Sequence, residues 1–331
     1  MNNVATTDRP PFGVRIMRAL GKEPDWSSMS AEDLSALAQK VNRKRASRAA
    51  RLITGSPDPD AIIEWQRVVL ADRALQVRVY RSSLGRRTAG AKSTGPLPLV
   101  LHVHGGGFVG TAVQSDWANS HFAARLPAVV VSVDHRLLAP GTALSAAVDD
   151  GWDVLRYVID HAAAWGIDPG RTAVVGESAG ALICALAAIR AREAGLQLRG
   201  QVLVNPVVDL TPEGFDYPSV REHSDSPTLN LQQMQFFRTL AVPPGADPRA
   251  LSPICADDLS GLAPAFVAVA PIDPVADHGR CFTERLRAAG TSASLTEYPG
   301  ATHAFLSMPG VVPQAKAARA EILEYLREVL S

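Results

Sequence analysis

The sequence TAVVGESAG (172–180) joins an apolar run to a G-x-S-x-G motif, and a helix-like segment follows at 179–194. A serine at a tight strand-to-helix turn presents its hydroxyl from strained backbone, and the flanking glycines leave room for that turn. Such a turn lies at the carboxyl edge of an α/β sheet, where ligand sites are found. A structural Gly-Ser turn is the alternative, but the strand before and the helix after favour a catalytic serine. Ser178 is therefore the predicted nucleophile.

The segments on both sides of this motif alternate between strands and helices. Apolar runs without polar alternation are typical of parallel strands that are buried on both faces. The expected strands of this kind span 97–103, 129–133, 172–175, 201–204 and 266–270. Two further strands are expected at 68–70 and 74–80. The sequence therefore predicts an α/β fold with a mostly parallel central sheet flanked by helices.

A glycine run, HGGG (104–107), ends the expected strand 97–103. Glycines expose backbone N–H groups without side-chain obstruction, so they can donate hydrogen bonds to an oxyanion that forms above Ser178. A flexible loop is the alternative, but the run precedes the serine turn in the order expected of lipases and esterases. We expect His104 to order this loop rather than to transfer protons. The predicted oxyanion-hole residues are Gly105, Gly106, Gly107 and Ala179.

A serine hydroxyl is a weak nucleophile and needs a base that a third group orients. The expected chain order is serine, acid, histidine. Three histidines follow Ser178, namely His223, His278 and His303. His303 follows a short expected strand at 294–298, where the catalytic histidine belongs, so it is the predicted base. The acid should come directly after the strand 266–270, which favours Asp273 and leaves Asp277 as the alternative.

Composition limits the classes of partner. The 331 residues carry 33 Lys plus Arg and 33 Asp plus Glu, so the formal net charge is zero and a nucleic-acid partner is not expected. Three cysteines, odd in number and far apart, fit neither a disulfide framework nor a zinc ligand set. We expect no metal and no organic cofactor.

The N-terminal region does not have the pattern of a signal peptide, because Arg15 and Arg18 interrupt the apolar residues between 12 and 20. No stretch of the chain reaches the length of a membrane span. A cytoplasmic location is the resulting expectation. The sequence does not determine the oligomeric state; a homodimer through an edge strand or the C-terminal helix is one alternative.

Two segments are expected to lie outside the sheet and to form a helical cap. Residues 1–58 contain a helix that begins after a capping box at Ser30, and the basic run 43–45 is interpreted as its solvated face. Residues 208–250 are rich in proline and glycine. An ordinary surface excursion is the alternative for this second segment. The remaining ranges, 59–207 and 251–331, are the expected two parts of the α/β core.

The substrate pocket is predicted with the least detail, because its walls are expected to come from the two cap segments. The candidate lining residues are Phe108, Phe215, Phe236 and Phe237. For each of them, simple packing within the cap is the alternative. A buried cap pocket favours short or medium acyl chains over long-chain fats, which need an open site.

Six stretches of the chain recur together in one known family. They are HGGGF (104–108), VSVDHRL (131–137), GESAG (176–180), SPICADDLSGLAPAFV (252–267), DPVAD (273–277) and TH (302–303). From about Leu97 to the C-terminus the chain resembles the hormone-sensitive-lipase-like family of bacterial and plant carboxylesterases. The resemblance implies the α/β-hydrolase fold with a helical cap. It also implies that Asp273, the first aspartate of D-P-x-x-D, is the catalytic acid and that Asp277 has a supporting role.

The chain departs from the usual pattern of that family at three places. Leu138 is an extra residue after the VSVDHRL stretch, and Gly141 stands where a glutamate is usual. Ala304, rather than glycine, follows the predicted base. Ala181 stands where glycine is commoner. None of these departures removes an expected catalytic group, and they are compatible with an unusual acyl or alcohol pocket.

The expected function is hydrolysis of short- to medium-chain carboxylic esters through an acyl-enzyme, with a small-molecule acyl substrate as the partner. Amidase, deacetylase, lactonase and acyltransferase activities use the same intermediate, so they remain alternatives. A small-molecule receptor is a further alternative, although receptors related to this family characteristically lose a member of the triad. A scaffolding role for the N-terminal helix is the last alternative.

Overall fold

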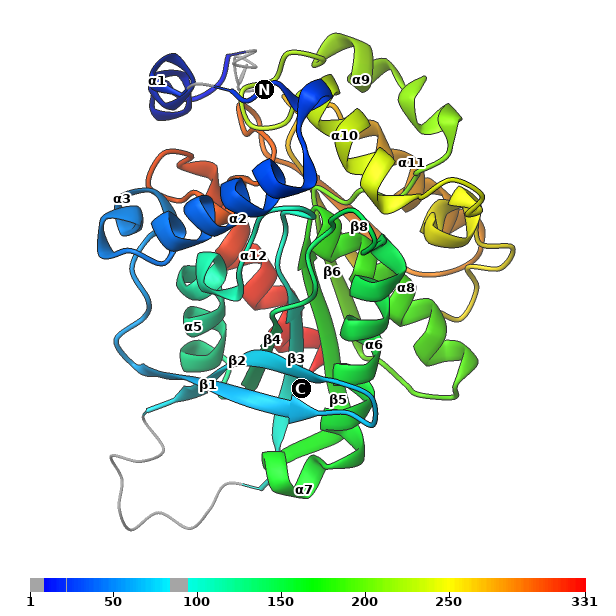
Figure 1. Ribbon diagram of the computed structural model, residues 1–331. Helices are drawn as coiled ribbons and strands as arrows, with labels where there is room; N and C mark the ends of the chain where they lie inside the picture. Colours follow the sequence, from blue (N-terminus) through cyan, green and yellow to red (C-terminus); the bar gives the residue numbers. More distant parts are fainter. Residues whose placement is uncertain (1–8, 22, 84–94) are drawn as a thin grey trace, which may run out of the picture.

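The structure is a computed structural model that describes residues 9–21, 23–83 and 95–331. Its centre is an eight-stranded sheet with the strand order β1-β2-β4-β3-β5-β6-β7-β8 (Figure 1). The strands are β1 (Ala61–Val69), β2 (Ala74–Ser82), β3 (Leu97–Val103), β4 (Val129–Val133), β5 (Ile167–Glu177), β6 (Gly200–Val204), β7 (Ala265–Val269) and β8 (Ala293–Glu297). The first two strands form an antiparallel hairpin, and β2 also pairs with β4 in antiparallel orientation. All pairings from β4 to β8 are parallel, so the predicted mostly parallel sheet is confirmed.

Helices cover both faces of the sheet and also lie beyond its end. They are α1 (Phe12–Leu20), α2 (Ala31–Arg45), α3 (Arg51–Thr54), α5 (Asp116–Arg125), α6 (Leu144–Asp160), α7 (Ala162–Trp165), α8 (Ala179–Glu193), α9 (Pro218–Glu222), α10 (Leu231–Ala241), α11 (Ala276–Ala288) and α12 (Gln314–Val329). Short 3₁₀ turns are η1 (Trp26–Ser28), η2 (Arg48–Ala50), η3 (Ala112–Ser115), η4 (Pro212–Phe215), η5 (Pro248–Leu251), η6 (Pro253–Cys255) and η7 (Phe305–Ser307). In the described ranges, no helix is long and apolar enough to cross a membrane.

The two faces of the sheet bury separate apolar clusters. Leu101 and its neighbours at every second position of β3 pack with α6, α8 and α11. Val100 points to the opposite face and packs with α5 and α12. Because both faces are covered, the parallel strands contain apolar residues in succession rather than in alternation. This burial explains why the strand limits of β3 and β4 coincide with the apolar runs of the sequence.

Two helical segments that are distant in sequence lie side by side over the carboxyl ends of the parallel strands. Helices α1 to α3 precede the sheet, and α9 and α10 lie between β6 and β7 (Figure 1, blue and yellow-green). Arg18 of α1 donates hydrogen bonds to both carboxylate oxygens of Asp225 at 2.6 Å. The ring of Trp26 lies 5.5 Å from that of Phe236 in α10. These contacts join the two segments above the serine turn, and we call the two segments together the cap.

Local sequence explains the start of each main cap helix. Ser30 and Asp33 form the expected capping box at the N-terminus of α2, with the Ser30 hydroxyl accepting from the Asp33 N–H. Asn230 and Gln233 form a second capping box at the start of α10. Each box satisfies backbone N–H groups that the first turn of a helix leaves free. The side chain of Asn230 also donates to Glu23 at 2.7 Å, which links the two halves of the cap.

Candidate active site

The serine turn connects β5 directly to α8. Ser178 has φ 57° and ψ −120°, a backbone conformation that L-residues rarely adopt. A Cβ atom on Gly176 would lie 2.3 Å from the carbonyl oxygen of Gly180, and one on Gly180 would lie 2.1 Å from the carbonyl oxygen of Val103. Both glycines are therefore required for the close approach of strand and helix. The turn holds the Ser178 hydroxyl above the carboxyl edge of the sheet.

Three of the sequence-predicted site residues meet in one hydrogen-bonded chain. The Ser178 Oγ lies 2.7 Å from His303 Nε2, and His303 Nδ1 lies 2.7 Å from Asp273 Oδ2. The other carboxylate oxygen of Asp273 accepts the Val275 N–H at 3.0 Å. All three are buried, and each follows the end of a different strand: β5, β7 or β8. In this geometry Nδ1–H donates to the carboxylate, which leaves Nε2 to accept the serine proton.

Burial and charge act in opposite directions on the base. Burial lowers the pKa of His303, but the carboxylates of Asp273 and Glu177 together raise it by more. The net result is a pKa above the ordinary value of histidine. His303 is thus suited to take up a proton, because its charged form is stabilised where it is needed.

Glu177 connects the serine turn to the segment after His303. Its carboxylate accepts the Leu306 N–H at 3.1 Å and the hydroxyl of Ser307. Burial raises the pKa of this carboxyl group. Ala304, which stands where glycine is usual, has a left-handed φ of 58°. Glu177 therefore holds the segment in place directly after a strained residue.

The glycine loop, residues 104–110, is held in place by hydrogen bonds to three other parts of the chain. The carbonyl of Gly107 accepts the N–H of Leu138 at 2.7 Å, so the extra residue found in the sequence braces this loop through its backbone. Gln114 donates to the Gly105 carbonyl at 3.1 Å. Asn42 of α2 accepts the N–H of Gly110 at 2.9 Å, which ties the loop to the cap. Such fixation keeps the N–H groups oriented before a charge develops.

Two stacked imidazoles lie beneath the glycine loop. The rings of His104 and His135 are parallel to within 18° at 4.3 Å, and His104 Nδ1 donates to the Gly105 carbonyl at 2.9 Å. Burial lowers the pKa of His135 to about 4, so this ring is neutral near pH 7. His104 lies below the loop and contacts its backbone, in agreement with the ordering role expected from the sequence.

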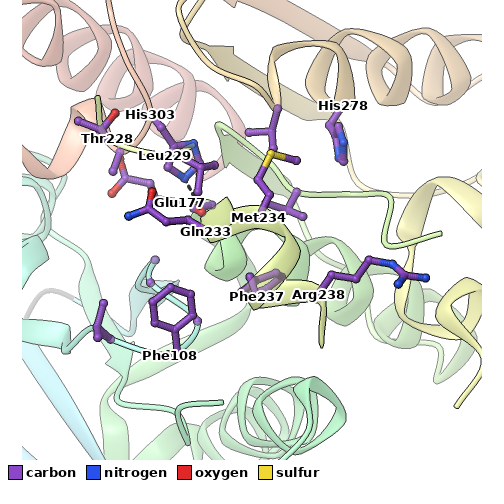
Figure 2. A pocket seen from close by; sticks show the side chains of 18 of the residues that line it. Phe108, Glu177, Thr228, Leu229, Gln233, Met234, Phe237, Arg238, His278 and His303 are labelled. Carbon is purple, nitrogen blue, oxygen red and sulfur yellow. Dashed lines mark hydrogen bonds between the residues drawn. The ribbon is translucent and has the colours of Figure 1, made fainter. Parts of the chain in front are cut away.

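The cavity in front of Ser178 has a volume of about 200 Å³ and lies between the sheet and the cap. Gly105, Gly106, Gly107, Phe108, Phe215 and Phe237 line it, together with Ser178 and His303. Figure 2 shows Phe108 and Phe237 on one side of the cavity, apart from His303. Phe236 does not line the cavity but packs against Phe108 at 5.3 Å and against Trp26.

Ala179 is buried at the first position of α8, behind the cavity surface. Within the described ranges, no three His, Cys, Asp or Glu side chains gather as metal ligands would.

Sequence reasoning missed several residues that line this cavity. They are Trp26, Arg45, Gln114, Leu229 and Met234, among others. The expectation that the basic run 43–45 is a solvated face is wrong for one residue, because Arg45 lines the cavity while Arg43 and Lys44 are exposed. A signal existed, because Leu34, Val41 and Arg45 recur at the spacing of one helix face.

Comparisons with known proteins show what the whole chain is similar to. A family model described as an alpha/beta hydrolase fold matches residues 100–307. The chain is 40% identical over 244 residues to carboxylesterase NlhH of Mycobacterium tuberculosis, which covers 71% of this chain and 74% of that protein. It is 32% identical over 328 residues to an ethyl acetate hydrolase of Pseudomonas putida, with 96% of each chain covered. The solved structure of a hyperthermophilic esterase from Pyrobaculum calidifontis matches with a TM-score of 0.82 and 28% identity, covering 96% of this chain and 97% of that chain.

A mostly parallel sheet with a serine at a sharp turn between strand and helix defines an α/β hydrolase. The chain belongs to the hormone-sensitive-lipase-like family of α/β-hydrolase carboxylesterases, as the resemblance of its motifs predicted. It is therefore an enzyme that hydrolyses carboxylic esters.

Proposed function

We propose that Ser178, His303 and Asp273 are the catalytic triad with which this carboxylic-ester hydrolase cleaves short- to medium-chain acyl esters. The observation that carries the proposal is the hydrogen-bonded chain Ser178–His303–Asp273, with 2.7 Å at both steps. A base within hydrogen-bond reach of a nucleophile, itself oriented by a third group, is the arrangement that activates a serine.

In the first step the Ser178 hydroxyl attacks the ester carbonyl while His303 takes its proton. Asp273 holds the imidazole in the required tautomer and stabilises its charged form. The tetrahedral intermediate places a negative charge on the former carbonyl oxygen. The backbone N–H groups of the glycine loop, with that of Ala179, are proposed to stabilise it. His303 then gives its proton to the departing alcohol, which leaves the acyl group on the serine.

In the second step water attacks the acyl-enzyme. His303 removes a proton from the water, a second tetrahedral intermediate forms, and its collapse returns the proton to the Ser178 oxygen. The products are a carboxylic acid and a free enzyme. The same residues serve both steps, so no metal or organic cofactor enters the proposed mechanism.

The size of the substrate is proposed from the cavity and the cap. About 200 Å³ enclosed by two cap segments suits small acyl and alcohol groups rather than long-chain fats. The relative from Pseudomonas putida is named for a small ester, ethyl acetate. We propose that the segments 1–58 and 208–250 act as a substrate-selecting cap on the core, 59–207 and 251–331. A cytoplasmic location and a homodimer stay predictions.

The test is hydrolysis of 4-nitrophenyl esters of increasing acyl length by the wild type and by Ser178→Ala. We expect activity on short and medium chains and a loss of about 10⁴-fold or more in kcat for the variant. Ser294→Ala is a matched control, because this exposed serine lies on β8 away from the cavity. Retention of full activity by Ser178→Ala would exclude the proposed triad. Preferential turnover of emulsified long-chain triglyceride would exclude the proposed substrate size.

Amide, lactone and acyl-transfer chemistry can be separated in the same assay. Matched amide and lactone substrates report the bond that is cleaved. Added alcohols report the acyl acceptor, because a transferred acyl group appears as a new ester rather than as an acid. If an amide or a lactone is cleaved faster than the simple esters, or if an added alcohol accepts the acyl group faster than water does, that reaction is the main activity at this site.

A further inference from the structure

A positively charged side chain, that of Arg45, lines the cavity of the proposed active site. Arg45 is the last residue of α2 and lines the same cavity as Ser178 and His303. Its Nη1 donates to Gln114 Oε1 at 2.7 Å, and the Gln114 amide donates to the Gly105 carbonyl at 3.1 Å. A Cβ atom built on Gly106 would lie 3.5 Å from that same Nη1. The guanidinium therefore lies beside the glycine loop, at the wall of the cavity in front of Ser178.

Among the described residues, no carboxylate lies within ion-pair distance of Arg45. Burial lowers the pKa of its guanidinium, and the charge of Glu177 opposes that effect only in part. The carboxylate of Glu177 already accepts from Leu306 and Ser307. A partly buried guanidinium that has a neutral hydrogen-bond partner but no carboxylate is incompletely compensated, and in a binding cavity this favours an anionic ligand.

The second arginine of the lining serves as a contrast. Arg238 in α10 donates its Nε–H to the Leu210 carbonyl at 2.7 Å. Figure 2 shows its guanidinium directed away from His303 and Glu177. Of these two cavity arginines, Arg45 is thus the one beside the glycine loop.

Two other residues of the lining carry donors whose hydrogen-bonding capacity is unused. Trp26 and Thr228 line the cavity, and their buried Nε1 and Oγ1 atoms have no hydrogen-bond partner among the described residues. The indole N–H can only donate, and the hydroxyl is able to donate. Buried donors that lack partners favour a ligand rich in acceptor oxygens. A carboxylate offers two oxygens and a negative charge.

We propose that the substrate of this enzyme carries a carboxylate in addition to the ester bond, and that Arg45 binds that carboxylate while Ser178 attacks the ester. The proposal rests on the proposed function, since it assigns the substrate class of the same site. The substrate class is the ester that retains one free acid: a half-ester of a dicarboxylic acid, or an acylated hydroxy acid. A guanidinium recognises a carboxylate through two parallel hydrogen bonds, which fixes the orientation of the ester.

The test compares charged and neutral esters of matched size. One pair is 4-nitrophenyl hydrogen glutarate and 4-nitrophenyl pentanoate, with the charge on the acyl side. The other pair is 2-acetoxypropanoate and its methyl amide, with the charge on the alcohol side. The readout is the ratio of kcat/KM for the charged to the neutral member of each pair. We expect the wild type to favour the charged member of at least one pair.

Arg45→Gln should lower that ratio about ten- to a hundredfold, the range for losing hydrogen bonds to a charged group. Arg45→Lys should retain part of the preference, because it keeps the charge but not the planar fork. Arg43→Gln is the matched control, because this exposed arginine lies on the same helix α2 outside the cavity, and it should leave the ratio unchanged. If Arg45 only clamps the glycine loop through Gln114, Arg45→Gln will slow both members of each pair equally. That result, or a wild type without preference in both pairs, would overturn the proposal.

A binding measurement tests recognition of the carboxylate without requiring catalysis. Calorimetry with Ser178→Ala should detect 4-nitrophenyl hydrogen glutarate and should lose that binding in the double variant with Arg45→Gln. If Arg45→Gln does not fold, inhibition of the wild type decides the question, with pentanoate expected to inhibit more strongly than pentanamide. Equal inhibition would count against the proposal.

The failure of the proposed triad and the failure of the carboxylate proposal give different results. If Ser178→Ala keeps full ester hydrolysis, the proposed triad fails. If the wild type cleaves neutral esters through Ser178 without charge preference, only the carboxylate proposal fails.

Discussion

The core and the cap of this protein are built on different principles. In the core, the strands β3 to β7 are almost completely buried, and the reacting side chains follow the ends of the parallel strands β5, β7 and β8. In the cap, the two halves meet through few contacts, one of which is the Arg18–Asp225 pair with side chains 46% and 82% exposed. A rigid sheet holds the chemistry to a fixed geometry, whereas a lightly held cap lets the shape and charge of the cavity vary. Reaction type and substrate choice are thus carried by separate parts of the molecule.

The largest expected difference between the core and the cap is the loss of kcat when a glycine with a left-handed backbone is replaced by alanine. Gly106 in the core loop has φ +90°, and a Cβ there would lie 1.9 Å from the Val109 carbonyl oxygen. Gly245 in the cap has φ +86° and nothing within 4 Å of its Cβ position. Gly106→Ala should displace the glycine loop and lower kcat about a hundredfold or more, as loss of an oxyanion donor does.

Gly245→Ala is the control for this experiment, because it introduces the same backbone strain without the steric conflict. Its kcat on short-chain 4-nitrophenyl esters should stay close to that of the wild type. Equal losses in both variants would mean that backbone strain alone, and not the position of the glycine loop, limits activity.

A substitution in the core should also lower the free energy of unfolding more than a substitution in the cap. Leu203 on β6 is fully buried between sheet and helices, so Leu203→Ala should lower the free energy of unfolding by about 2–5 kcal/mol. Arg18→Ala removes an exposed ion pair and should cost less than about 1 kcal/mol. Urea unfolding followed by circular dichroism measures both changes. A cost for Arg18→Ala that approaches that of Leu203→Ala would show that the cap contributes to global stability as the core does.

The smallest effect is expected in the pH profile. Because the pKa of His303 is raised, the acid limb of kcat/KM should lie above the ordinary pKa of histidine. Glu177→Gln removes a buried negative charge that favours protonated His303, so the limb should move to lower pH. Glutamine still has an oxygen that accepts the Leu306 N–H, so the loop geometry is kept.

Asp225→Asn removes one negative charge from the exposed surface of the cap and should leave the acid limb where it is. The pH dependence of kcat/KM on a neutral ester checks both variants. A shift of equal size in the two would mean that net charge, rather than the buried carboxylate next to the base, sets the pKa of His303.

The sequence predicted the core far better than the cap, for a physical reason. The apolar runs 97–103 and 129–133 coincide with β3 and β4 because burial on both faces leaves a continuous apolar signal. The predicted nucleophile, acid and base come together because strand order places their loops at one edge. Trp26 and Phe236 meet across the cap without any local pattern that pairs them. Arg45 lines the cavity although its charge predicts solvent exposure, because it lies on the same face of α2 as the buried Leu34.

The distance along the chain between the two halves of the cap has a consequence for synthesis. Arg18 and Asp225, like Glu23 and Asn230, are 207 residues apart in sequence. At about 5–20 residues per second, a ribosome needs roughly 10–40 s to add that length of chain. During this interval the helices α1 and α2 have left the ribosome but have no partner in α10. We therefore expect α1 and α2 to dock only after α10 has been made, so that the cavity is enclosed by segments that are synthesised at widely separated times.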